Sequence, residues 1–261
     1  MFMRNLPTPS NRQAAFTLIE LLTVIAIIGV LAAMLLAAIV QARINAKRKL
    51  CQTEESGLVG GISAYYTSYS RPPVSTNVLN AVAGTTNDFT FGTSLTGSSG
   101  QLANMPANLA TGSPISIITT NSPYQNNNSE VIAILRDDAY YPEFNAATAQ
   151  GHIYNPQQAA FYQGRAAAGP TTLGAGPGAP GIGTDDILRD PWGLPYIVTL
   201  DLNGDNRVFD PYLNQMYQNQ YPGSTLLTPG QSVVWSFGPT GQINPTIGSQ
   251  NKANKYIVTS Y

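Results

Sequence analysis

The N-terminal part of the chain is dominated by one long apolar segment. Residues 16–40 read FTLIELLTVIAIIGVLAAMLLAAIV and contain a single charged residue, Glu20. The stretch from Leu21 to Val40 is twenty residues without a charge, and in a helix it would span roughly 30 Å, the thickness of a bilayer's hydrocarbon core. A secretory signal peptide has an apolar core of only about 7 to 15 residues. The pattern therefore predicts a transmembrane helix.

The helical pattern continues beyond the apolar segment, now on one face only, while charged residues such as Lys47, Arg48, Glu54 and Glu55 fall elsewhere. This predicts one helix over residues 16–69, with its second half packed into a head domain. The helix is expected to end at Arg71-Pro72-Pro73, because proline lacks the backbone donor and disfavours helix before it. The residues of the apolar stripe are Ile44, Cys51, Leu58, Ile62, Tyr65 and Tyr69.

Three glycines lie within the second half of this predicted helix. Gly57, Gly60 and Gly61 each cost helix stability. They are expected to mark a bend or a close approach of another part of the backbone.

The rest of the chain alternates between loop-rich and strand-like segments. Residues 74–128 are rich in Ser, Thr, Asn and Gly and predict surface loops with little regular structure, 115–118 being the only strand-like run. A short helix over 130–136, capped by Ser129, would place Val131, Ile132 and Leu135 in the core. The Gly/Pro/Ala-rich stretch 164–183 lacks the ending of a phosphate-binding loop and predicts a flexible connection. Short antiparallel strands are expected over 196–200, 207–209, 232–237 and 256–259.

Composition and charge narrow the classes of function. Only 10% of the 261 residues are charged and the formal net charge is -1, so no general attraction to nucleic acid is predicted. The single cysteine, Cys51, excludes an intramolecular disulfide and is interpreted as a small buried helix residue. No catalytic constellation accompanies the only histidine, His152. The acidic pairs at 137–138 and 185–186 are interpreted as solvated turn residues.

Glu20 needs a specific explanation, because an acidic group inside an apolar helix is costly and marks a functional site. Its partner should be a cation at the same depth, and residues 16–40 contain no Lys or Arg. Cutting the peptide bond before Phe16 would create that cation, since a free α-amino group has a pKa of about 7.7 to 8. The amine and the carboxylate of adjacent subunits could then pair.

This segment resembles the prepilin motif of type IV pilins and type II secretion pseudopilins. The resemblance implies that a prepilin peptidase removes residues 1–15, that Phe16 is then N-methylated, and that Glu20 guides docking into a filament. The family usually has Gly before the cut, and this chain has Ala15, so slower but real cleavage is expected. The matching residues are Phe16-Thr17-Leu18-Ile19-Glu20-Leu21-Leu22.

Two later segments resemble motifs of major pseudopilins. They are Asp190-Pro191-Trp192-Gly193-Leu194-Pro195-Tyr196 and Ser236-Phe237-Gly238-Pro239-Thr240-Gly241. The resemblance thus covers both ends of the chain, and it covers residues 74–189 poorly.

The family resemblance implies an α+β pilin fold, in which a long N-terminal helix, transmembrane in its first half, packs on an antiparallel head sheet with long loops. The expected parts are a leader over 1–15, a transmembrane and filament-core helix over 16–40, its amphipathic continuation over 41–70, and an exported head over 71–261. The chain is expected to cross the inner membrane once, with its head in the periplasm. Expected partners are membrane lipid, prepilin peptidase, the inner-membrane assembly platform, and copies of itself or other pilins in a filament.

Three roles remain open from sequence. The leading one is a structural subunit of a type II secretion pseudopilus or type IV pilus-like filament. The alternative is a minor or tip pilin whose loop-rich head binds a surface, DNA or a secreted substrate. A membrane-anchored exported enzyme is the third, although no enzymatic activity is predicted.

A loop with oxygen side chains at alternate positions suggests a calcium site. Asp201, Asn203 and Asp205, with Asp210 close behind, suit a hard cation such as Ca²⁺. The match to an EF-hand loop is partial, because Asn206 stands where that loop has Gly. A solvated Asp/Asn turn is the other interpretation, and both stay open.

Overall fold

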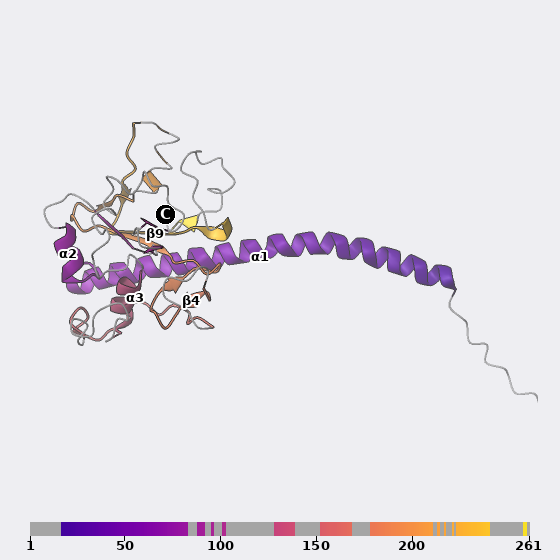
Figure 1. Cartoon of the computed structure of the whole chain (residues 1–261), viewed down its shortest axis with the longest axis horizontal. Helices are drawn as coiled ribbons and strands as arrows, with labels where there is room; N and C mark the ends of the chain where they lie inside the picture. The colour runs from indigo at the N-terminus through magenta and orange to yellow at the C-terminus, as the bar shows by residue number, and fades with distance from the viewer. Residues whose placement is uncertain are drawn as a thin grey trace, which may run out of the picture. The chain divides into compact units, whose positions relative to one another are not determined.

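The computed structural model describes residues 17–82, 88–91, 95–96, 101–102, 128–138, 152–168, 178–210, 213–214, 217, 221, 223–240 and 258–259. The chain divides into two compact units, residues 1–45 and 46–261. Helix α1 (Leu18–Tyr69) begins in the first unit and ends in the second. Figure 1 draws it as one coiled ribbon. The predicted single helix is confirmed.

The first unit consists, within the described residues, of the N-terminal part of α1. The helix has a window long and apolar enough to cross a membrane, and 0% of that window is buried. Side chains such as Leu18, Ile27 and Leu36 are more than half exposed. An uncovered apolar helix of this length is stable in lipid, so the finding supports anchoring in a membrane.

In the second unit, α1 supplies one wall of the hydrophobic core. Cys51, Leu58, Ile62 and Tyr65 are all fully buried, as the apolar stripe predicts. The helix ends at Tyr69, and Ser70 has a φ of 51°, which breaks the helix just before the two prolines. The stripe is therefore confirmed from Cys51 to Tyr69 as the face that packs on the head, whereas Ile44 is half-buried and is not part of the core cluster.

The main sheet is antiparallel, with strand order β1-β6-β9-β10. Its strands are β1 (Phe89–Phe91), β6 (Ile197–Leu200), β9 (Ser232–Ser236) and β10 (Val258–Thr259). In the central pair, Val198 stands opposite Val234, and both belong to the core cluster. Figure 1 shows β9 beside α1, in agreement with this shared core. The antiparallel sheet and three of its strands match the prediction from sequence.

The described residues also form three two-stranded sheets. They pair β2 (Leu95–Thr96) with β3 (Gln101–Leu102), β4 (Gly181–Ile182) with β5 (Leu188–Arg189), and β7 (Arg207–Val208) with β8 (Thr228–Pro229). β7 confirms the strand expected near 207–209. A single turn of 3-10 helix, η2, covers Gly238–Thr240.

The prediction for residues 74–128 was wrong in part. The segment contains α2 (Thr76–Val82) and β1, which is an edge strand of the main sheet. β1 has three residues, all buried, and the hydroxyls of Thr90 and Thr199 lie 3.0 Å apart across the pair. A strand this short shows no alternation, so only its partner β6 identifies it. The strand-like run 115–118 lies outside the described residues.

Helix α3 (Ser129–Arg136) confirms the short helix, and Val131, Ile132 and Leu135 are buried as expected. The capping prediction was wrong. The cap position is Asn128, one residue earlier, and no side-chain capping hydrogen bond forms there. The Asn128 side chain bonds instead to backbone groups of Leu188 and Tyr196.

Candidate functional site

The first turn of α1 is closed by Thr17 and Glu20. The backbone N–H and the hydroxyl of Thr17 each donate to Oε2 of Glu20 at 2.8 Å. In return, the backbone N–H of Glu20 donates to the Thr17 hydroxyl at 3.4 Å. This is the reciprocal capping box of a helix N-terminus, in which a Thr is followed three residues later by a Glu. The acid in the first turn also complements the helix dipole.

This geometry gives Glu20 a local role that the sequence argument did not include. The donating amide belongs to Thr17, so it remains a peptide N–H after a cut before Phe16. Ala15 and Phe16 lie outside the described residues. Cleavage, methylation and the pairing of Glu20 with the Phe16 amine of a neighbouring subunit therefore stay predictions.

The two segments that resemble pseudopilin motifs meet at Asp190. Oδ1 of Asp190 accepts hydrogen bonds from the backbone N–H groups of Trp192 at 2.8 Å and Leu194 at 2.9 Å. Its Oδ2 accepts a 2.5 Å hydrogen bond from the hydroxyl of Ser236. Residues 190–194, called here the 190–194 turn, are thus folded by one buried carboxylate and joined by it to the end of β9.

Gly193 is required at the tip of this turn. Its φ is +90°, and a Cβ there would lie 2.2 Å from the carbonyl oxygen of Gly178. Any other residue would displace one of the two backbones.

The 190–194 turn is attached to α1 by Lys47. The Lys47 Nζ donates to the carbonyl oxygen of Pro191 at 2.8 Å and lies 6.0 Å from the centre of the Trp192 ring. The hydroxyl of Tyr196 donates to Oε2 of Glu54 at 2.6 Å. The turn and the helix are therefore joined by polar contacts as well as by the hydrophobic core.

Beneath these contacts lies a carboxyl group that sequence reasoning missed. Glu55 was placed off the apolar stripe, yet it is fully buried. Its position, four residues after Cys51 and three before Leu58, puts it on the buried face, and this spacing could have revealed it. Burial raises the pKa of Glu55 to about 8 and that of Asp190 to about 6.

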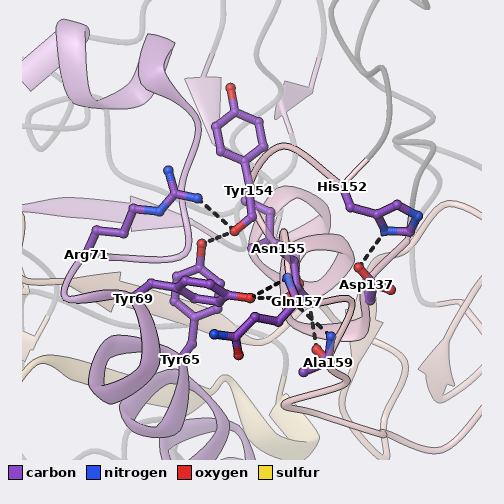
Figure 2. Close-up of polar contacts among 10 residues, drawn as sticks. Tyr65, Tyr69, Arg71, Asp137, His152, Tyr154, Asn155, Gln157 and Ala159 are labelled. Carbon is purple, nitrogen blue, oxygen red and sulfur yellow. Dashed lines mark hydrogen bonds and ion pairs between the residues drawn. The ribbon is translucent and has the colours of Figure 1, made fainter.

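The C-terminal end of α1 is held by a second polar network, shown in Figure 2. The hydroxyl of Tyr65 donates to the carbonyl oxygen of Tyr154, which also accepts from the guanidinium of Arg71 at 2.9 Å. The hydroxyl of Tyr69 donates to Oδ1 of Asn155 at 2.7 Å. Residues 152–162 are thereby fastened to the last two turns of the helix.

The only histidine belongs to the edge of this network. Nδ1 of His152 lies 2.6 Å from Oδ1 of Asp137, the residue that follows α3. The geometry gives His152 a structural contact between α3 and the segment 152–162.

The interpretation of 185–186 as solvated was wrong, because Asp185 and Asp186 are both buried. Asp185 forms a two-point ion pair with Arg189, at 3.0 and 2.6 Å. Asp186 lies 2.9 Å from the guanidinium of Arg136. Burial, with the nearby Asp138 carboxyl, raises the pKa of Asp186 to about 7. Both carboxyls are buried because each has an arginine partner.

The predicted calcium loop is closed by its own side chains. The carboxylate of Asp201 accepts from the backbone N–H groups of Gly204 at 2.7 Å and Asn206 at 2.8 Å. The side-chain oxygens of Asn203 and Asp205 each accept from the backbone N–H of the residue two positions later, both at 2.8 Å. These are Asx turns, which explain the alternate spacing without a metal.

Asp210 is turned into the core. Its carboxylate accepts from the hydroxyl of Thr199 at 2.6 Å and the indole N–H of Trp235 at 2.9 Å. Asp88, which the sequence argument did not single out, lies near the loop and accepts from the backbone N–H groups of Leu202 and Phe209. Burial raises its pKa to about 6. Among the described residues, no three His, Cys, Asp or Glu side chains are grouped as a metal site, and Ca²⁺ binding stays a prediction.

Comparison with known proteins yields one match. Residues 10–36 match the family model of the prokaryotic N-terminal methylation motif. No curated protein and no solved structure matches the chain. The motif is consistent with the type IV pilins and pseudopilins that the sequence resembles, and it indicates a pilin-like substrate of prepilin peptidase. The long helix and the antiparallel sheets of the head are consistent with a pilin fold.

Proposed function

We propose that this chain is a structural subunit of a type II secretion pseudopilus or a related type IV pilus-like filament. The observation that carries the proposal is the methylation motif at residues 10–36, which leads directly into a helix whose apolar window is 0% buried. Such a surface needs lipid around it before assembly and neighbouring helices around it afterwards. The head domain is fastened to the continuation of the same helix.

In this proposal, prepilin peptidase cuts between Ala15 and Phe16 and the new N-terminus is methylated. The chain waits in the inner membrane with its head in the periplasm. The assembly platform then inserts it into a filament of its own copies or of other pilins, with Glu20 meeting the Phe16 amine of a neighbouring subunit. The role is structural, with no catalytic step.

Mass spectrometry of the mature N-terminus tests this proposal. We expect N-methylated Phe16 as the first residue. An intact Met1, or a cut near residues 38–42, would contradict it. Ala15→Gly is expected to speed leader removal, because Gly is the residue that the family carries there, whereas a bulky Ala15→Leu should block it.

The alternative role as a minor or tip subunit depends on the loops within 74–189, most of which lie outside the described residues. It stays a prediction. Abundance in sheared filaments would favour the structural role, and localisation to filament tips would favour the alternative.

A further inference from the structure

The carboxyl group of Glu55 is buried with almost no hydrogen-bonding support. Its Oε1 lies 3.5 Å from Sγ of Cys51, and a thiol is a weak donor. Its Oε2 is buried and, among the residues that the structure describes, has no hydrogen-bond partner. An ionised carboxylate at such a position lacks the donors that water would provide.

The charges around Glu55 also oppose its ionisation. Asp190, from the 190–194 turn, and Glu54, from α1 itself, both act on it as negative charges. Of the nearby cations, Lys47 donates to the carbonyl of Pro191, and Arg165 forms an ion pair with Glu54 at 3.3 Å. Arg48, seven residues earlier on the helix, is half-buried and has an interaction of its own.

The remaining polar side chains around Glu55 are neutral or form hydrogen bonds with other residues. The Tyr196 hydroxyl donates to Glu54 and lies 3.4 Å from Sγ of Cys51, and the Ser236 hydroxyl donates to Asp190. Burial raises the pKa values of Cys51 and Tyr196 above their ordinary values, so both side chains stay protonated and uncharged near neutral pH. The site accepts a neutral Glu55 and disfavours a charged one.

We propose that Glu55 is a proton-dependent lock: protonated, it lets the 190–194 turn close on α1, and loss of its proton opens the turn from the helix. This inference goes beyond the filament role and does not depend on it. An opened turn would release the contact between Lys47 and Pro191. It would also expose Cys51, whose Sγ accepts from the hydroxyl of Tyr196, two residues after the turn.

The direction of the pH effect follows from the two states. In the open state Glu55 faces water and ionises near its ordinary pKa of 4.5, whereas burial raises its pKa to about 8 in the closed state. The closed state is therefore fully stable below about pH 4.5 and loses stability as the pH rises. The loss is complete above about pH 8. Between these limits the open population grows by up to about tenfold per pH unit.

The single cysteine provides the measurement. Full-length protein in detergent micelles is treated with a thiol reagent between pH 5 and 9, and the labelling rate of Cys51 is recorded for the wild type, Glu55→Gln and Glu54→Gln. Dividing the wild-type rate by the Glu55→Gln rate removes the ordinary ionisation of the thiol. We expect this ratio to rise by up to about tenfold per pH unit and to level off above about pH 8.

Glu54→Gln is the comparison variant: it removes one of the two negative charges that raise the pKa of Glu55, but it leaves Glu55 itself to titrate. Its labelling rate should therefore keep a steep rise with pH, which levels off at a lower pH than in the wild type. A flat ratio for Glu55→Gln, or an equal flattening by Glu54→Gln, would overturn the proposal. Glu55→Met is a second neutral variant, and failure of both Glu55→Gln and Glu55→Met to fold would also overturn it, since the lock is closed by a neutral side chain.

Discussion

At the scale of single residues, two adjacent glycines of α1 have opposite roles. A Cβ on Gly61 would lie 2.9 Å from the carbonyl oxygen of Phe161 and 3.2 Å from Cβ of Tyr162. That backbone is held in place, because the N–H groups of Phe161 and Tyr162 both donate to the carbonyl of Leu135. A Cβ on Gly60 would meet nothing within 4 Å. The sequence suggested a close approach at these glycines, and the structure assigns it to Gly61.

Alanine substitutions should separate these roles. Gly61→Ala is expected to lower the free energy of unfolding by about 1 to 3 kcal/mol, because the segment 161–162 must move away from the helix. Gly60→Ala is expected to raise it by about 0.5 to 1 kcal/mol, since alanine favours helix. Denaturant unfolding of the full chain in detergent measures both. If both substitutions changed the free energy of unfolding in the same direction, Gly61 would not be in close contact with the backbone of Phe161.

At the scale of elements, Asn128 joins helix α3 to the strands. Its Nδ2 donates to the carbonyl oxygens of Leu188 and Tyr196, both at 2.9 Å, and its Oδ1 accepts from the N–H of Leu188 at 2.9 Å. One fully buried amide thus satisfies three backbone groups. It does so between the start of α3 and strand β5, so its loss affects the packing of elements.

We expect Asn128→Ala to lower the free energy of unfolding by roughly 2 to 4 kcal/mol, because the N–H of Leu188 and the carbonyl of Tyr196 lose this buried partner, while the carbonyl of Leu188 keeps the N–H of Tyr196. Asn128→Asp should be equally harmful, since a carboxylate cannot donate to two carbonyls. Thr53→Ala is the control, because its exposed hydroxyl bonds only to the Lys49 carbonyl of its own helix. Thermal and denaturant unfolding measure the stability of each variant. A loss for Asn128→Ala no larger than that for Thr53→Ala would contradict the role given to Asn128.

The loop before β7 has its own test, because its Asx turns explain the sequence pattern without a metal. If the loop binds Ca²⁺, a free concentration one hundred times the dissociation constant stabilises the chain by about 2.7 kcal/mol. In that case Ca²⁺ raises the unfolding temperature of the wild type and Asp205→Ala abolishes the rise, whereas a loop held only by its Asx turns shows neither change. A wild-type unfolding temperature that ignores both Ca²⁺ and chelator would refute the site.

At the scale of the whole molecule, the sequence predicts what depends on local periodicity. The long helix follows from one continuous pattern, and the stripe at Cys51, Leu58 and Ile62 is buried as that pattern requires. The central strands β6 and β9 were predicted because they are short runs with β-branched or aromatic residues between turn residues. Each of these signals lies within a few neighbouring residues.

Features that depend on distant partners could not be predicted in the same way. Asp185 is buried because Arg189 folds back onto it, and β1 is a strand because β6 lies beside it. The contact between Asp190 and Ser236 joins residues 46 positions apart. Glu55 was missed because charged residues were assumed to lie off the buried face. The sequence thus identified α3 and the strands β6, β7, β9 and β10 of the head, whereas α2, β1 and the polar connections needed the structure.

Assembly of the chain into a filament can be tested at Glu20. Glu20 has two roles to separate: a charge for the Phe16 amine of a neighbouring subunit, and an acceptor in the capping box with Thr17. Glu20→Gln keeps an acceptor oxygen and loses the charge. Thr17→Ala keeps the charge and loses the hydroxyl of the box. The two variants therefore form a matched pair.

If the charge guides docking, Glu20→Gln and Glu20→Ala should both reduce incorporation into sheared filaments by about tenfold or more, which corresponds to about 1.4 kcal/mol. Thr17→Ala should assemble close to the wild-type level, because capping contributes to one helix end only. Each variant is compared at equal membrane abundance and with the mature Phe16 N-terminus verified by mass spectrometry. Normal assembly of Glu20→Gln, together with failure of Thr17→Ala, would show that the capping box guides assembly and that the charge does not.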